Sequence, residues 1–281
     1  MIDLHTHTNC SDGTDSPAQL VNKALSEGLS VLALTDHDTT SGWQAAQQAL
    51  RSNLSLVLGA EISCLTKDGI SVHMLGLLFD GAHRSMQEML ENTRDGRIPR
   101  ARKMIELLNA GGISISMDDV EAVKPVGATL GRPHIADALV KNGVVASRDE
   151  AFTDLLHNNS PYYVAHLAPT PEDAISMIRS AGGVAVIAHP FASHRGQVLS
   201  VEDFLPLKNA GLNAIEVNHR DHSNEERKAL AEIARELDLV ITGASDYHGT
   251  GKLNSLGENH THQAEWERLE SQADHRRVLK A

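Results

Sequence analysis

Short apolar runs alternate with amphipathic segments along most of the 281-residue chain. Short runs with polar ends are typical of buried strands, and apolar residues at helical spacing between them predict helices. We expect strands at residues 2–4, 31–34, 54–58, 72–78, 184–188, 214–217 and 240–242, and helices at 17–27, 41–50, 170–181, 201–210 and 224–237. This alternation predicts a parallel sheet, and its repetition over seven strands favours a closed β/α barrel.

One connection is far too long for such a barrel. Between the fourth and fifth strands, from residue 82 to residue 171, helical patterns cover residues 85–110, 117–123, 132–142 and 147–157. A normal β/α connection adds only a few residues to a single helix. We therefore expect residues 82–171 to form an inserted helical cap that binds substrate, and residues 1–81 and 172–281 to form a metal-binding barrel.

Side chains that bind metal ions accompany the apolar runs in a fixed order. His5 and His7 would point to the same side of a strand, because side chains alternate along it. The full set is His5, His7, Asp12, His37, Glu61, His73, His189, Asp246 and His248. The carboxyl ends of barrel strands meet at one face, so these side chains should converge there. Imidazole and carboxylate ligands without thiolates suit Mn, Zn or Fe.

The motifs around these residues resemble those of the polymerase-and-histidinol-phosphatase (PHP) family. They are His5-Thr6-His7, Ser11-Asp12-Gly13, Thr35-Asp36-His37-Asp38, Gly59-Ala60-Glu61, His73, Ala188-His189-Pro190 and Ser245-Asp246-Tyr247-His248. The resemblance implies a distorted seven-stranded TIM-like β/α barrel with two or three divalent metal ions. It implies His5, His7, Glu61 and Asp246 as ligands of one ion, Glu61, His73 and His189 of a second, and Asp12, His37 and His248 of a third. We expect Asp12, Glu61, Asp246 and His248 to be catalytic as well.

A site with paired divalent ions favours chemistry at phosphorus. Paired ions activate a water to hydroxide and stabilise the attacking and leaving oxygens of an in-line displacement. Hydrolysis of a phosphate ester is therefore the leading prediction. A C–N hydrolase resembling the amidohydrolases is the runner-up, although no lysine stands at a strand end where a carbamylated bridge would be expected. A metal-binding module without turnover is the third alternative.

Composition narrows the class of substrate. The formal net charge is −12 at pH 7, the sequence pI is about 5.7 and only 3% of residues are aromatic. A processive nuclease would profit from a basic track and aromatic stacking platforms, and the chain offers neither clearly. We therefore expect a small phosphorylated nucleotide, or very short RNA, as substrate, and neither duplex DNA, a membrane nor an obligate protein partner. We also expect a cytoplasmic protein without a signal peptide, since no apolar run approaches the ~20 residues of a membrane span.

The predicted cap supplies a candidate site for a second phosphate. Arg132-Pro133-His134 opens a helix whose free N–H groups and neighbouring guanidinium suit a phosphate. His194 and Arg195, in the loop after His189, are further candidate substrate-binding residues. Gly-Arg-Pro-His and the insertion also resemble one PHP subfamily, the 3′,5′-nucleoside bisphosphate phosphatases and related 5′–3′ exoribonucleases. This resemblance implies loss of the 3′-phosphate, as in the conversion of adenosine 3′,5′-bisphosphate to AMP, with histidinol phosphate as a weaker alternative.

Several other basic residues are expected to be solvated and to have no role in the site. They are Arg94, Arg97, Arg100, Arg102 and Lys103 on one helix, His219 and His222 in a surface loop, and His260 and His262 in a C-terminal tail. His219 and His222 follow the strand end at Val217 and could contact substrate, but a surface loop is the expected position. His260 and His262 have the spacing of a ligand pair without a strand, and spacing alone is weak support for a site.

Overall fold

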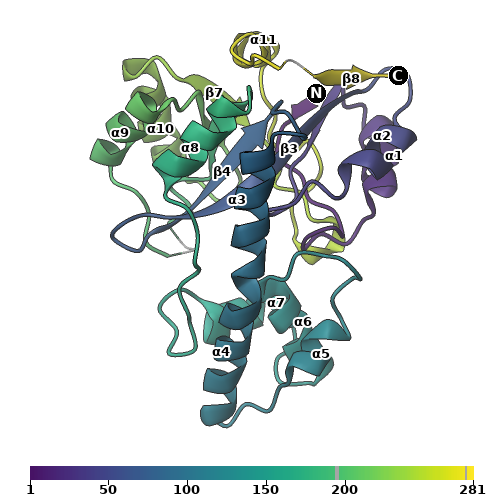
Figure 1. Cartoon of the computed structure of the whole chain (residues 1–281), viewed down its shortest axis with the longest axis vertical. Coiled ribbons are helices and arrows are strands. Elements are labelled where there is room, and N and C mark those ends of the chain that lie inside the picture. The colour runs from purple at the N-terminus through teal and green to yellow at the C-terminus, as the bar shows by residue number, and fades with distance from the viewer. Residues whose placement is uncertain (194–195, 276) are drawn as a thin grey trace.

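The computed structural model describes residues 1–193, 196–275 and 277–281 and contains a barrel-shaped, nearly closed sheet (Figure 1). Its strands follow the order of the chain: β1 (Ile2–Asp3), β2 (Val31–Leu34), β3 (Ser55–Leu65), β4 (Ser71–Leu77), β5 (Val184–Ala188), β6 (Ala214–Asn218) and β7 (Val240–Gly243). A short β8 (Val278–Lys280) pairs antiparallel with β3. A parallel bridge between Thr6 and Tyr247 brings the segments after β1 and β7 together. The predicted β/α barrel of seven strands is confirmed.

The prediction of an all-parallel sheet is wrong at β4. This strand runs antiparallel to both β3 and β5, and a tight turn at Thr66–Gly69 joins it to β3 without a helix. Gly69 has a φ of +84°, a conformation that glycine adopts without strain. Because β4 runs in the opposite direction, its beginning lies at the barrel end where the parallel strands finish. His73, near the start of β4, therefore reaches the same end as the other ligands.

Alternate residues of the strands fill the inside of the barrel. On β5, Val184, Val186 and Ala188 belong to the inner core, whereas Ala185 and Ile187 pack against the outer helices. Helix α11 (Gln263–Glu270) closes the barrel at the end opposite the cap (Figure 1), and its Trp266 and Leu269 belong to the same inner core. The prediction of a solvated C-terminal tail is therefore wrong, although His260 and His262 are themselves exposed.

Helices cover the outside of the sheet. They are α1 (Pro17–Ser26), α2 (Trp43–Ala49), α3 (Arg84–Asp95), α8 (Pro171–Ser180), α9 (Phe204–Ala210) and α10 (Asn224–Glu236). Sequence signals explain where several begin: Ser16 and Ser223 each form a capping box with the residue three positions later, and Pro171 occupies the first turn of α8. The predicted helices around the barrel are thus confirmed to within a few residues.

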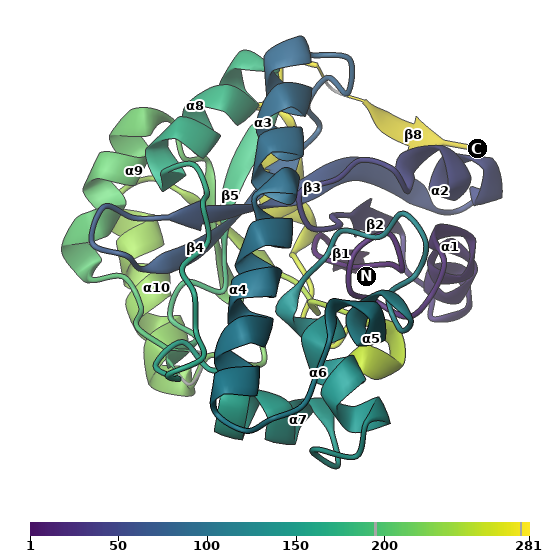
Figure 2. The same cartoon turned by 60° about the horizontal axis from the view of Figure 1, so that its bottom comes forward.

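The inserted segment forms a separate helical layer below the barrel (Figures 1 and 2). It comprises α4 (Arg97–Ala110), α5 (Met117–Glu121), α6 (Arg132–Lys141), α7 (Arg148–Ala151) and one π-helical turn, Phe152–Leu156. These elements share a core of their own, which includes Met104, Leu108, Ile135 and Leu139. We refer to this layer, residues 97–164, as the cap.

The single long helix predicted at residues 85–110 is broken at Gly96. Pro99 lies in the first turn of α4, where it has no N–H to donate to residue 95 and its ring disfavours a continuous helix. Met86 and Leu90 of α3 pack in the barrel core, whereas Ala101 and Met104 of α4 pack in the cap core. The boundary between the two hydrophobic cores therefore lies at Gly96. The domain boundary predicted at residue 82 stays a prediction.

None of the helices in the described part of the chain is long and apolar enough to cross a membrane.

Candidate metal centre

All nine predicted ligands gather at the end of the barrel that faces the cap. His5 and His7 follow β1, His37 follows β2, and Glu61 and His73 lie on the paired strands β3 and β4, where Glu61 pairs with Leu75 and His73 with Ser63. His189 follows β5, and Asp246 and His248 follow β7. His189 and Asp246 adopt positive φ angles of 31° and 52°, which non-glycine residues rarely do. Such strained conformations cluster at functional sites because the surrounding structure enforces them.

Four donor atoms meet at the first group of ligands. His5 Nε2 lies 3.0 Å from His7 Nε2 and 3.2 Å from Glu61 Oε2, and His7 Nε2 lies 3.1 Å from the same Glu61 oxygen. Asp246 Oδ1 lies 3.5 Å from His5 Nε2 and 3.4 Å from His7 Nε2. Ligands at about 2.1 Å from an ion are roughly 3.0–3.4 Å apart in tetrahedral or octahedral geometry. The spacing of these atoms therefore fits a common cation.

Glu61 also serves a second group through its other oxygen. Glu61 Oε1 lies 2.7 Å from His73 Nδ1 and 3.3 Å from His189 Nε2. The two oxygens of one carboxylate thus face two different sets of imidazoles, as a carboxylate that bridges two ions requires. This is the arrangement that the sequence resemblance implied for Glu61.

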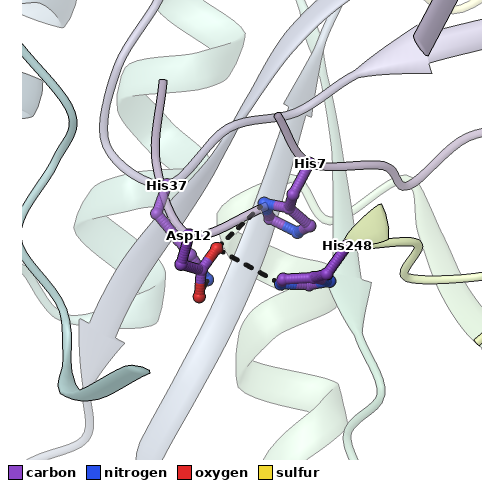
Figure 3. A group of neighbouring side chains, drawn as sticks. All are labelled: His7, Asp12, His37 and His248. Atoms are coloured by element: carbon purple, nitrogen blue, oxygen red, sulfur yellow. Dashed lines mark ion pairs between the residues drawn. The ribbon is translucent and has the colours of Figure 1, made fainter. Parts of the chain in front are cut away.

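The third group contains Asp12, His37 and His248. Figure 3 shows these three side chains pointing toward one another beside His7. Asp12 Oδ1 lies 3.2 Å from His248 Nε2, and Asp12 Oδ2 lies 3.6 Å from His37 Nε2. His37 Nδ1 also lies 3.1 Å from Glu61 Oε2, so His37 stands between this group and the bridging carboxylate.

The loop that carries Asp12 is fixed from two sides. A Cβ on Gly13 would lie 2.7 Å from the carbonyl oxygen of His7, so only glycine lets the chain pass this close. The buried carboxylate of Asp36 accepts hydrogen bonds from the backbone and hydroxyl of Thr8 and from the hydroxyl of Ser11. Asp36 therefore holds the loop between His7 and Asp12 rather than contacting a ligand directly.

Several buried polar atoms of the centre have no hydrogen-bond partner within the described residues. They are His7 Nδ1, His37 Nδ1, Glu61 Oε2 and His248 Nε2. A buried polar atom without a partner is costly, so such atoms mark a missing ligand or ion. Their grouping with carboxylate oxygens at ligand spacing fits divalent cations, and three overlapping groups of this kind can be defined around His7, Glu61 and His37.

The charges at the centre also call for cations. Burial raises the pKa of Glu61, but His37, His73 and His5 outweigh it and hold that pKa well below its usual range. Burial lowers the pKa of His7, but Asp246 and Glu61 outweigh it and raise that pKa to about 9. The folded chain thus keeps the carboxylate of Glu61 ionised and draws protons onto His5 and His7, whose pKa values are both raised. Metal binding would displace those protons, because a ligating imidazole must be neutral.

A second layer of polar residues supports the ligands, and most of it was not predicted. Glu216, buried on β6, accepts from His5 Nδ1 at 3.0 Å and from the backbone N–H of His189 at 2.8 Å. Lys252 Nζ lies 2.8 Å from Asp246 Oδ2. Such contacts orient metal-binding imidazoles and carboxylates. A charged residue in the otherwise apolar strand Ala214–Asn218 was the available signal for Glu216.

His219 and His222 are buried, so their assignment to a surface loop is wrong. His219 Nε2 lies 3.5 Å from Asp246 Oδ2, and its ring lies 5.3 Å from that of His189. His222 donates from Nδ1 to Val217 O and accepts at Nε2 from Phe191 N, which joins the segments after β5 and β6. Both residues follow the end of β6, the position at which the barrel carries its ligands.

The metal centre opens into a cavity of about 1220 Å³ between the barrel and the cap. Asp12, His73 and His189 line its barrel side, and Arg100, Arg132 and Arg148 line its cap side. The guanidinium of Arg132 donates to Leu156 O at 2.8 Å and Asn158 Oδ1 at 2.7 Å and lies over the rings of Phe152 and Tyr163. These contacts hold its charge at the wall of the cavity.

The other predicted substrate residues have different positions. His134 is buried, and its Nδ1 accepts from the backbone N–H of Gly131, so this nitrogen caps α6 instead of facing a ligand. His194 and Arg195 lie outside the described residues. Of the predicted substrate residues that the structure describes, Arg132 lines the cavity and His134 does not.

Arg97 is buried, which corrects its assignment to a solvated helix face. Its Nε and Nη2 donate to Asp38 Oδ2 at 2.9 and 2.5 Å, and Nη1 donates to Leu130 O at 3.1 Å. Arg100 is half-buried and donates to Val164 O. Arg102 and Lys103 are exposed, as predicted.

The fold and this cluster of imidazoles and carboxylates, which could hold metal ions, define a class of protein, a metal-dependent hydrolase. The chain belongs to the PHP family: the PHP domain matches residues 3–92. It is 35% identical over 252 residues to a 3′,5′-nucleoside bisphosphate phosphatase from Chromobacterium violaceum, covering 89% of this chain and 88% of that protein. It is 34% identical over 259 residues to a 5′–3′ exoribonuclease from Haemophilus influenzae, covering 92% and 93%.

A solved structure agrees with this assignment. A protein from Bifidobacterium adolescentis, provisionally described as a metal-dependent phosphoesterase, is 40% identical and superposes with a TM-score of 0.90 over 96% of both chains. The predicted family, fold and enzyme class are confirmed, and the chain is a metal-dependent phosphoesterase. Its substrate and the identity of its metal ions are matters for proposal.

Proposed function

We propose that this phosphoesterase removes the 3′-phosphate of a nucleoside 3′,5′-bisphosphate, with adenosine 3′,5′-bisphosphate as the model substrate. One observation carries the proposal: the metal centre and the guanidinium of Arg132 line opposite sides of the same cavity. A substrate with two phosphates can occupy both sides at once. The name of the Chromobacterium violaceum relative supports the same substrate class.

The residues of the barrel would hold two or three divalent ions, which we expect to be Mn, Zn or Fe. The ligand groups around Glu61 and the group of Asp12, His37 and His248 would bind them. Such ions lower the pKa of water and offset negative charge on phosphate oxygens. Glu216 and Lys252 keep His5 and Asp246 oriented for this task. Asp12, Glu61, Asp246 and His248 are thus the residues we expect to be indispensable for turnover.

The cap would bind the phosphate that is not cleaved. Arg132 is placed for this role by Leu156 O, Asn158 and the two aromatic rings. A guanidinium presents a planar fork of donors that matches phosphate oxygens. A 5′-phosphate held there directs the 3′-phosphate to the metal centre, and the product keeps the 5′-phosphate.

The first test uses metal-reconstituted protein and adenosine 3′,5′-bisphosphate. We expect release of inorganic phosphate and accumulation of the 5′-monophosphate, with simple amides left intact. Formation of the 3′-monophosphate would reverse the assignment of the two phosphates. Amide cleavage without phosphate release would favour the C–N hydrolase.

The second test concerns Arg132. Arg132→Ala should lower kcat/KM on the bisphosphate. The loss should correspond to ~1.5–3 kcal/mol of transition-state stabilisation, the range for a hydrogen bond to a charged group. On adenosine 3′-monophosphate, which lacks the 5′-phosphate, the same change should have little effect. Arg102→Ala, on an exposed position of α4, is the matched control and should alter neither rate. Equal losses on both substrates would remove Arg132 as the phosphate clamp.

A 5′–3′ exoribonuclease acting on short RNA is the second candidate function. The Haemophilus influenzae relative favours it, since its similarity to this chain is nearly the same. A short oligonucleotide would place its 5′-phosphate at Arg132 as well. Faster release of successive 5′-nucleotides from RNA than of phosphate from the bisphosphate would move the protein to this branch. A cytoplasmic location also stays a prediction.

A further inference from the structure

His166 is a buried side chain whose two ring nitrogens both have no partner within the described residues. It lines the cavity and is 8% exposed. The segment around it is fixed at both ends, because Arg100 Nε donates to Val164 O at 2.8 Å and Leu65 N donates to Pro169 O at 3.0 Å. The next residue, Leu167, is 78% exposed and does not line the cavity. The imidazole is therefore held against the cavity by its backbone rather than by its own hydrogen bonds.

Positive groups surround His166. Burial, together with the charges of Arg97, Arg100, His73 and Arg132, lowers the pKa of this imidazole to about 3. The ring is thus neutral at pH 7, with one nitrogen as a donor and the other as an acceptor. His73, which belongs to the metal centre, and Arg132, the proposed phosphate clamp, line the same cavity as His166.

We propose that His166 recognises the 2′-hydroxyl of the substrate's ribose and so favours ribonucleotides over 2′-deoxyribonucleotides. The inference rests on the proposed function and deepens it. In a nucleoside 3′,5′-bisphosphate the 3′- and 5′-oxygens are esterified, and the 2′-hydroxyl is the one free hydroxyl of the sugar. With the 3′-phosphate at the metal centre and the 5′-phosphate at Arg132, the sugar would lie in the cavity that His166 lines.

The chemistry of the two groups is complementary. A hydroxyl both donates and accepts a hydrogen bond, as a neutral imidazole does. A phosphate only accepts, and the guanidinium of Arg132 and the metal centre are already placed to bind phosphates. A buried polar atom that gains a partner only in the complex discriminates between the two sugars, because a substrate without the hydroxyl leaves that atom unpaired.

The test compares ribose and 2′-deoxyribose forms of adenosine 3′,5′-bisphosphate on wild type, His166→Leu and His166→Gln. Wild type should favour the ribose form in kcat/KM by about threefold to tenfold, the range for one neutral hydrogen bond. His166→Leu should lower the rate on the ribose form to that on the deoxyribose form and leave the latter nearly unchanged. His166→Gln, which keeps a donor and an acceptor, should restore part of the preference.

A control variant and a binding measurement complete the design. His157→Leu removes another imidazole from the same cavity and should leave the ribose-to-deoxyribose ratio unchanged. Calorimetric binding of AMP and 2′-deoxy-AMP should show the same loss of preference in His166→Leu, without any turnover. Thermal melting should confirm that each variant is folded.

The outcomes separate the two proposals. A wild type that cleaves both forms equally, or a His166→Leu variant that loses the same factor on both, overturns the role of His166 while the bisphosphatase function stands. A wild type that leaves bisphosphates intact overturns the proposed function, and the AMP binding comparison then decides the role of His166 alone.

Discussion

The barrel and the cap both present charged side chains to one cavity, but they hold them in different ways. In the barrel most of the ligands lie on strands or shortly after them, with Asp12 in a loop, and backbone pairing fixes the spacing of several, as the bridge between His37 and Glu61 shows. In the cap the charged groups are arginines, and carbonyl and carboxylate oxygens far away in the sequence hold them. Arg97 reaches Asp38, and Arg132 reaches Leu156 and Asn158.

This difference fits two different functions, metal binding in the barrel and phosphate binding in the cap. A metal centre needs donor atoms placed to a few tenths of an ångström, which strand ends provide because the sheet is rigid. A clamp for phosphate needs positive charge over a wider region, which long side chains on helices provide. Changes in the barrel should therefore act on chemistry, whereas changes in the cap should act on stability and on substrate binding.

The largest effect should follow from Glu61→Gln. One oxygen of Glu61 serves the His5–His7 group and the other serves His73 and His189, so loss of its charge weakens two groups at once. We expect turnover to fall by more than the roughly 10–100-fold that changes around a metal's ligands cause, together with loss of bound metal. Phosphate release and elemental analysis measure the two effects.

Glu91→Gln, the same change on the exposed face of α3, is the control and should leave both quantities unaltered. Full activity of Glu61→Gln with its metal content intact would contradict a mechanism that depends on this bridging carboxylate. Asp246→Asn tests the His5–His7 group alone and should also lower turnover and the amount of bound metal.

The ligands could be predicted because the rule that places them is local. A polar residue directly after a buried strand lies at the end of the barrel, and this holds for His37, His189 and Asp246 alike. The same rule applied to β6 would have marked His219, which we placed in a surface loop. The rule does not explain His73, which lies near the start of β4. Its position at the ligand end of the barrel follows only from the antiparallel direction of that strand.

The cap could be predicted only in outline. Helical spacing indicated its helices, but the fate of each arginine depends on a partner that spacing does not identify. Arg97 and Arg94 look alike in the sequence, yet Arg97 is buried because Asp38, beside the ligand His37, lies within its reach. Pro99 was a signal for the break at Gly96. The helical pattern across residues 85–110 led us to predict a single helix instead.

The second-largest effect should come from Arg97→Met. The Arg97–Asp38 pair is almost fully buried, and removing one partner leaves an uncompensated charge, which destabilises a protein by about 3–5 kcal/mol. We expect this loss in the free energy of unfolding from urea titration. Arg84→Met offers the same change at an exposed pair with Glu88 and should leave that free energy nearly unchanged.

The double variant Arg97→Met/Asp38→Asn should regain part of the lost stability, because no buried charge remains without a partner. Asn also tolerates the positive φ of 50° at this position. A loss in Arg97→Met no larger than that in Arg84→Met would mean that the pair does not hold the cap to the barrel.

The smallest effect, when it is expressed per pH unit, should appear in the pH dependence of stability. The pKa of His166 in the folded protein is about 3, below its ordinary value of 6.5, because burial and the arginines of the cap disfavour its charge. Between these two pH values the unfolded chain carries a proton on His166 that the folded chain does not. The contribution of this residue to stability is therefore complete above pH 6.5 and is lost as the pH falls toward 3.

His166→Gln has no such proton, so the free energy of unfolding should fall less steeply between pH 6.5 and pH 3 in this variant than in wild type. The difference in slope is limited to one proton, about 1.4 kcal/mol per pH unit. Urea titrations at half-unit steps on metal-free protein measure it. His262→Gln, at an exposed position, should keep the slope of wild type. Parallel curves for wild type and His166→Gln would show that this imidazole becomes protonated in the folded chain, and would place it in water rather than among the arginines of the cap.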